Sequence, residues 1–125
     1  MKVGTGASLA ATRISVVGNI QAEGARSTSV RDSSIGGSFQ IKQGRAASLA
    51  GTTVGGDVLY DTNAGPLAAR WNVVGGNIQA FANRGGVDIA ANRVDGNLQC
   101  KENAPAPTGG SNIVQGNKED QCARL

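Results

Sequence analysis

Apolar and polar residues alternate in short stretches, and these stretches recur about every 20 residues along the chain. A glycine marks each recurrence, and subtraction of residue numbers gives spacings of 19, 19, 20, 20 and 20 between successive marker glycines. The marker glycines are Gly18, Gly37, Gly56, Gly76, Gly96 and Gly116. A fixed period of this length is the signature of stacked structural repeats.

The residues around each marker glycine also match from repeat to repeat. The position two residues before the glycine is apolar in every repeat: Val16, Ile35, Val54, Val74, Val94 and Val114. The position two residues after it is apolar in the first five: Ile20, Phe39, Val58, Ile78 and Leu98. A third apolar pair stands nine and seven residues before the glycine, as in Leu67 with Ala69 and Val87 with Ile89. Side chains of a strand alternate between two faces, so apolar residues two apart indicate an extended segment with one buried face. The apolar positions of each repeat therefore indicate three short strands.

These patterns predict an all-β chain that forms a right-handed parallel β-helix. It would have about six coils of 19–20 residues, with three short strands per coil, in a single domain spanning residues 1–125. The repeat is too short for a four-stranded propeller blade and lacks the helical period of a leucine-rich repeat. Right-handedness follows from the general bias of parallel crossovers.

The last repeat differs from the others and predicts a C-terminal cap over residues 115–125. Lys118 and Asp120 occupy positions that are apolar in the earlier coils, and a polar terminal coil is how solenoids end. Cys100 and Cys122 fall in adjacent coils, close enough for a disulfide that pins the cap. Two reduced, buried thiols are the alternative. A disulfide implies an oxidising compartment and therefore export.

Three further features belong to the corners of the coils. The position four residues before the marker glycine becomes asparagine in successive coils, at Asn72, Asn92 and Asn112, which predicts a ladder of side-chain hydrogen bonds along the axis. Trp71 is interpreted as a packed corner residue, with contact to a partner as the alternative. The Pro-rich and Gly-rich segment 105–110 is interpreted as an irregular corner that replaces a strand.

A candidate binding surface follows from polar side chains that recur on the outward side of one strand. We call it the amide face. Its residues are Gln21, Gln40, Asn77, Gln79, Asn97 and Gln99. Amides at regular spacing match the hydroxyls of an extended polysaccharide, which is the functional hypothesis. The competing interpretation is that the amides hydrogen-bond to one another and stabilise the strands.

The composition argues against several function classes. The chain has no His and only two Cys, so we expect no metal site and no cofactor. No converging carboxylates or nucleophile motif are present, so no catalytic residue is assigned, and Asp57 is interpreted as a turn residue. Basic residues are spread singly, which argues against nucleic-acid binding. No apolar run is long enough to predict a membrane span.

Residues 94 to 122 resemble the C-terminal end of exported bacterial repeat proteins of uncharacterised function, and the likeness continues upstream through the glycine-asparagine coils. The resemblance implies export and a β-helix, but no activity. A looser likeness to bactofilins, whose β-helices polymerise end to end, rests on pieces such as Val-Gly-Gly-Asp-Val at 54–58. The longer coil and the two cysteines depart from that family.

Together these features indicate a non-catalytic structural or binding module of an exported or cell-surface bacterial protein. Its expected partners are a polysaccharide, a partner protein or a second copy that associates through the N-terminal edge, where no polar cap is evident. The alternatives are a carbohydrate-active enzyme of the polysaccharide lyase or hydrolase type and a bactofilin-like assembly element.

Overall fold

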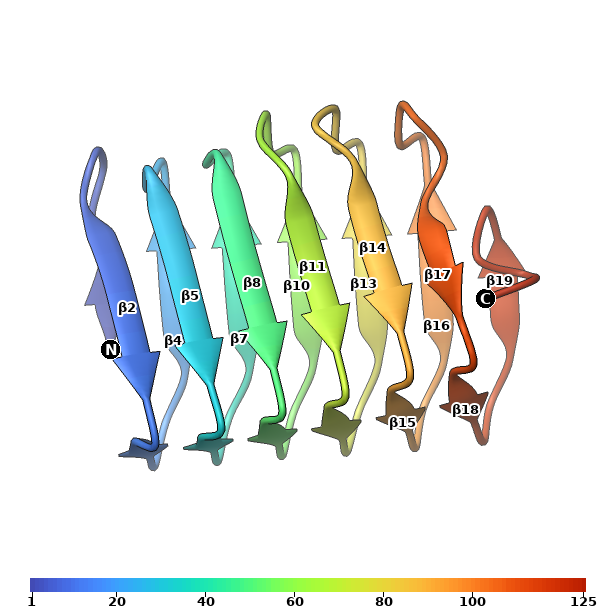
Figure 1. Ribbon diagram of the computed structural model, residues 1–125, viewed down its shortest axis with the longest axis horizontal. Coiled ribbons are helices and arrows are strands. Elements are labelled where there is room, and N and C mark those ends of the chain that lie inside the picture. Colours follow the sequence, from blue (N-terminus) through green and yellow to red (C-terminus); the bar gives the residue numbers. More distant parts are fainter.

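A computed structural model describes all residues 1–125 as a right-handed parallel β-helix, as the sequence pattern predicts. In Figure 1 the chain runs down the front strands, crosses at the bottom and returns up the fainter strands behind, while it advances from the N-terminus at the left to the C-terminus at the right. The chain forms no apolar helix of membrane-spanning length.

Each coil contributes one strand to each of three parallel sheets. Sheet A contains β1 (Lys2–Val3), β4 (Ile20–Glu23), β7 (Phe39–Lys42), β10 (Val58–Asp61), β13 (Ile78–Phe81), β16 (Leu98–Lys101) and β19 (Lys118–Asp120). Sheet B contains β2 (Ser8–Thr12), β5 (Ser27–Arg31), β8 (Ala46–Ala50), β11 (Leu67–Arg70), β14 (Val87–Ala90) and β17 (Thr108–Gly110). Sheet C contains β3 (Ser15–Val16), β6 (Ser34–Ile35), β9 (Thr53–Val54), β12 (Val73–Val74), β15 (Arg93–Val94) and β18 (Ile113–Val114).

The inward side chains form one continuous core along the axis, because the strands pair in register from coil to coil. Val58 pairs with Ile78, and Tyr60 pairs with Ala80, so like columns stack directly. The largest inward side chain, Tyr60, is fully buried, and its hydroxyl donates a hydrogen bond to the Ala68 carbonyl at 2.6 Å. Burial raises the pKa of this hydroxyl, so it keeps its proton and remains a donor.

Two of the three corners in a coil contain a residue in the left-handed conformation. Between sheets B and C, the φ angles of Asp32, Trp71 and Ala91 are 50°, 56° and 55°. Between sheets A and B, Thr62 and Ala82 have φ angles of 56° and 55°. This conformation costs a non-glycine residue about 1 kcal/mol. The residue that follows each of them in the chain is buried, which identifies these corners as the points where the chain turns inward.

Two corner assignments from the sequence are wrong. Trp71 is not packed: it occupies one of the left-handed corners and is 64% exposed. The segment 105–110 is only partly irregular, because Thr108–Gly110 forms strand β17 and pairs with β14, with Thr108 opposite Asp88. Here backbone pairing to the preceding coil outweighs the weak strand propensity of Gly109 and Gly110.

The C-terminal cap contains an apolar plug in addition to the polar positions that the sequence indicates. After β19 the chain turns across the end of the helix, and Cys122 and Leu125 join the core with 0% and 8% exposure. Cys100 and Cys122 form the expected disulfide, with their Cα atoms 5.3 Å apart. The bond thus joins the inward side of β16, in the fifth coil, to the tail.

Loss of this disulfide is expected to lower the free energy of unfolding. The bond spans 22 residues, and closing a loop of that size contributes about 3 kcal/mol in the chain-entropy model. The double variant Cys100→Ala/Cys122→Ala should therefore unfold at a lower urea concentration than the wild type. Alkylation of the denatured wild type without reductant should add no label; two labels would contradict the bond.

Replacement of Thr28 by Val is expected to stabilise the protein by about 1 kcal/mol. Thr28 points inward from β5 and is fully buried, and its hydroxyl has no hydrogen-bond partner. Val has nearly the same shape without the unpaired polar group. The matched control is Thr52→Val. The Thr52 hydroxyl donates a hydrogen bond to the Ala50 carbonyl at 2.9 Å, so its loss should destabilise the protein. Urea denaturation of both variants would show opposite signs; destabilisation by Thr28→Val would contradict the expectation.

Candidate functional site

The glutamines of the amide face form one column on the outward side of sheet A. Gln21 pairs in register with Gln40, and Gln79 pairs with Gln99. Leu59 interrupts the column between these two pairs. The sequence pattern therefore places the glutamines correctly along one line, but they form two separate groups instead of a continuous strip.

Within each group the amides hydrogen-bond to one another along the axis. Gln21 Nε2 donates to Gln40 Oε1 at 3.0 Å, and Gln79 Nε2 donates to Gln99 Oε1 at 2.9 Å. Gln99 Nε2 in turn donates to a carboxylate oxygen of Glu119 at 2.9 Å. All four glutamines are half-buried. Each amide thus uses part of its hydrogen-bonding capacity within the protein and keeps the remainder for solvent or a ligand.

The two asparagines of the amide face serve the corner that precedes sheet A. Asn77 Oδ1 accepts the backbone N–H of Asn97 at 2.8 Å, and Asn97 Oδ1 accepts that of Asn117 at 2.8 Å. Asp57 occupies the same column, and its Oδ1 accepts the backbone N–H of Asn77 at 2.7 Å. These side chains are therefore oriented along the axis, toward the next coil.

The marker glycines leave the space that these side-chain oxygens occupy. A Cβ atom on Gly76 would overlap Asp57 Oδ1, and a Cβ atom on Gly96 would overlap Asn77 Oδ1. Glycine is required where backbone and a neighbouring group approach so closely. The recurring glycine and the polar residue that follows it are thus two parts of one contact between successive coils.

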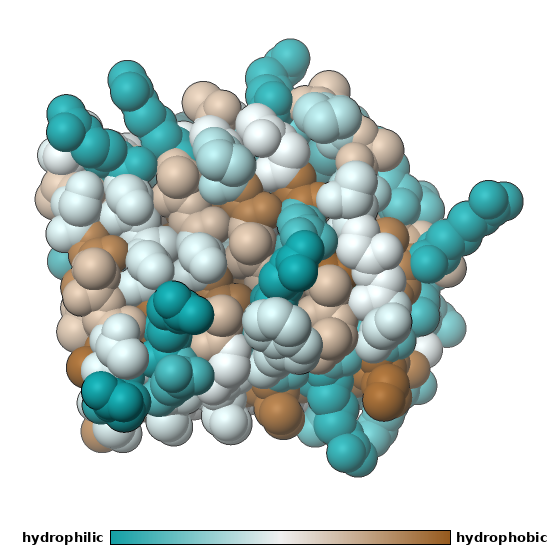
Figure 2. All heavy atoms as spheres, viewed as in Figure 1, coloured by the Kyte–Doolittle hydropathy of each residue, from teal (hydrophilic) through white to brown (hydrophobic).

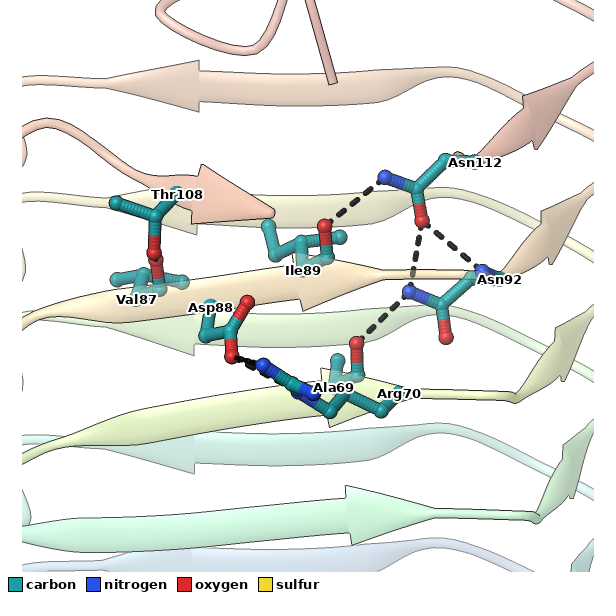
Figure 3. Close-up of polar contacts among 8 residues, drawn as sticks. All are labelled: Ala69, Arg70, Val87, Asp88, Ile89, Asn92, Thr108 and Asn112. Carbon is teal, nitrogen blue, oxygen red and sulfur yellow. Dashed lines mark hydrogen bonds and ion pairs between the residues drawn. The ribbon is translucent and has the colours of Figure 1, made fainter. Parts of the chain in front are cut away.

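The predicted asparagine ladder is present at the corner between sheets B and C (Figure 3). Asn92 Oδ1 accepts both the backbone N–H and the Nδ2 group of Asn72, each at 3.0 Å. Asn92 Nδ2 donates to the Ala69 carbonyl at 2.8 Å and to Asn112 Oδ1 at 3.0 Å. Thr52 and Ser33 continue this ladder in the earlier coils with hydroxyl groups.

A second ladder, which the sequence analysis missed, lies at the corner between sheets A and B. Asn63, Asn83 and Asn103 are buried and bonded in the same way: Asn83 Oδ1 accepts the backbone N–H and the Nδ2 group of Asn63, each at 3.0 Å. Their spacing of 20 residues is visible in the sequence. The equivalent positions in earlier coils are Ala25 and Gly44, so the column carries no polar signal there.

The outward side of sheet B differs from the amide face. Its middle column consists mainly of small side chains: Ala10, Ser29, Ser48, Ala68, Asp88 and Thr108. Figure 2, which looks onto the strands of sheet B, shows mostly pale side chains there, with few strongly hydrophilic ones. Arg70 and Asp88 form an ion pair on this side. Sheet A therefore offers more groups for recognising a polar ligand.

No cluster of three or more His, Cys, Asp or Glu side chains is arranged to hold a metal ion. Comparison with protein-family models, with curated proteins and with solved structures found no match to this chain.

The Asn92→Ala substitution is expected to destabilise the fold far more than Gln79→Ala. Asn92 is 2% exposed, and its loss leaves the Asn72 N–H and the Ala69 carbonyl buried without partners, at about 1–3 kcal/mol each. Gln79→Ala removes one half-exposed bond, which contributes about 1 kcal/mol or less. Urea denaturation compares the two directly. Equal losses would show that the inner ladder is no more important to stability than the amide face.

Proposed function

We propose that this chain is a non-catalytic structural module whose N-terminal end pairs with the same end of a second copy, while its C-terminal end is closed. The difference between the two ends of the β-helix is the observation that carries the proposal. Most asparagine and glutamine side chains along the axis hydrogen-bond to the neighbouring coil, which supports a structural role.

At the C-terminal end both asparagine ladders finish on the tail. Asn103 Nδ2 donates to Gln121 Oε1 at 3.0 Å, and Asn112 Nδ2 donates to the backbone carbonyl of Leu125 at 2.9 Å. The disulfide fixes the segment between these two contacts to the core. The ladder side chains that would otherwise bond to a further coil are thus satisfied by the chain itself.

At the N-terminal end of the β-helix, no segment of residues 1–125 takes this role. Strands β1, β2 and β3 are the edges of their sheets and pair on one side only. Strands β17, β18 and β19 are the edges at the other end, but there the tail with Cys122 and Leu125 lies across the core. Leu9, Ala11 and Val16, whose equivalents are buried in the second to fifth coils, are only partly buried here. An edge with unpaired backbone groups beside apolar side chains is a template for another strand edge.

A second copy related by a two-fold axis satisfies such an edge. The two N-terminal coils would then meet as an isologous interface, in which a strand edge on the two-fold axis lies against its own symmetry mate. Because the other end is closed, this association stops at a dimer. A bactofilin-like filament needs two open ends and is therefore the less favoured form of assembly.

We further propose that the module works outside the bacterial cytoplasm, in an exported or cell-surface protein. The disulfide supports this, since such bonds persist in oxidising compartments.

The test is analytical ultracentrifugation over a wide concentration range. The wild type should shift from monomer to dimer as concentration rises. Leu9→Lys places a charge on the edge and should keep the protein monomeric. Ile113→Lys, which changes a 66% exposed residue near the closed end, is the matched control and should dimerise like the wild type. A wild type that stays monomeric throughout, or a dimer unaffected by Leu9→Lys, would overturn the proposal.

A further inference from the structure

The largest hollow on the molecule lies on sheet A at its N-terminal end, over part of the amide face. We call it the N-terminal groove. It is shallow, with a volume of about 610 Å³. The polar side chains along it belong to Lys2, Gln21, Glu23, Gln40, Lys42 and Gln43. The sequence pattern and the shape of the surface thus point independently to Gln21 and Gln40.

The groove exists because the first strand of sheet A is short. Strand β1 has two residues, whereas its neighbours β4 and β7 have four each. The chain leaves the sheet at Gly4, so the end of β4 has no full-length strand beside it on that side. Gly4 and Gly24 also line the groove and contribute no side chain beyond Cα.

The charges along the groove favour a ligand with carboxylates. Lys2 and Lys42 are exposed, and no carboxylate lies within ion-pair distance of either ammonium group. Lys101, at the equivalent position to Lys42 three coils further along sheet A, is by contrast paired with Asp120 at 3.9 Å. Glu23 also lines the groove, opposite Lys42 on the neighbouring strand, so the charged side chains there are two lysines without an ion-pair partner and one carboxylate. The groove therefore keeps an excess of positive charge.

The amides between the lysines favour a ligand with hydroxyls. The single bond from Gln21 Nε2 to Gln40 Oε1 leaves the carbonyl oxygen of Gln21 and the amino group of Gln40 without a protein partner. Lys2, Gln21 and Gln40 follow one another in register along the axis, one per coil. A donor and an acceptor side by side match a hydroxyl, which is both.

We propose that the N-terminal groove binds an acidic oligosaccharide of the uronate class, laid along the helix axis. Its carboxylates face Lys2 and Lys42, and its hydroxyls bond to Gln21 and Gln40. Coil spacing of about 4.8 Å gives these groups a regular repeat that an extended polymer can follow. The inference goes beyond the proposed dimer and does not depend on it.

The test is titration of the labelled protein with an oligogalacturonate, followed by NMR of the backbone and glutamine side-chain amides. Shifts should concentrate at Gln21, Gln40 and their neighbours. The methyl ester of the same oligosaccharide, which lacks the charges, should bind at least about tenfold more weakly, a difference of about 1.4 kcal/mol. Binding should also weaken as salt concentration rises.

Two pairs of variants locate the site. Lys2→Gln/Lys42→Gln should weaken binding about tenfold, whereas Lys101→Gln, on the same face but outside the groove, should leave it unchanged. Gln21→Ala/Gln40→Ala should weaken binding, and Gln79→Ala/Gln99→Ala should not. These residues are on the surface, and urea denaturation of each variant verifies that it is folded.

The outcomes separate this inference from other possibilities. The absence of binding, or equal binding by the Lys2→Gln/Lys42→Gln variant, would overturn it. Equally tight binding of poly-glutamate would show that charge alone is recognised and would also overturn the assignment to a saccharide. Repeating the titration with the monomeric Leu9→Lys variant separates the two proposals, because the groove should bind whether or not the dimer forms.

Discussion

The structure depends on hydrogen bonds that side chains make to the backbone of the next coil. A β-helix must turn its chain several times per coil beside a narrow core, and every inward turn buries N–H and C=O groups that strand pairing does not reach. Asn72, Asn92 and Asn112 satisfy these groups at one corner, and Asn63, Asn83 and Asn103 do so at another. An unpaired buried group costs about 1–3 kcal/mol, so each ladder asparagine stabilises the contact between its coil and the neighbouring one.

The same requirement explains the period of the sequence. The corner that enters sheet A has no buried ladder, and there the oxygen of Asn77 or Asp57 reaches the backbone of the next coil through space that only glycine leaves free. Glycine and polar residue must therefore recur together, one pair per coil. An insertion in one coil would break this contact with its neighbours, which keeps coil length between 19 and 20 residues.

A feature of the fold could be predicted from the sequence where neighbouring coils carry the same kind of residue at equivalent positions. The apolar columns, the ladder at Asn72 and the disulfide were predicted because each follows from stacking of equivalent positions. The ladder at Asn63 was missed because Ala25 and Gly44 dilute its column. The exposure of Trp71 depends on the conformation of one corner, and the burial of Leu125 depends on the path of the tail. Neither feature recurs from coil to coil, so the repeat pattern does not predict them.

The candidate binding surface shows the same division between repeated and local features. Sequence spacing places Gln21, Gln40, Gln79 and Gln99 on one line. It does not show that the first two and the last two have different neighbours. In the later coils Glu119 accepts from Gln99, and Asp120 pairs with Lys101, so charge and amide are both engaged. Only at the N-terminal end does the short strand β1 leave a hollow beside unpaired lysines. Periodicity builds a uniform face, and the interruption of that periodicity is what makes one part of the face different enough to recognise a ligand.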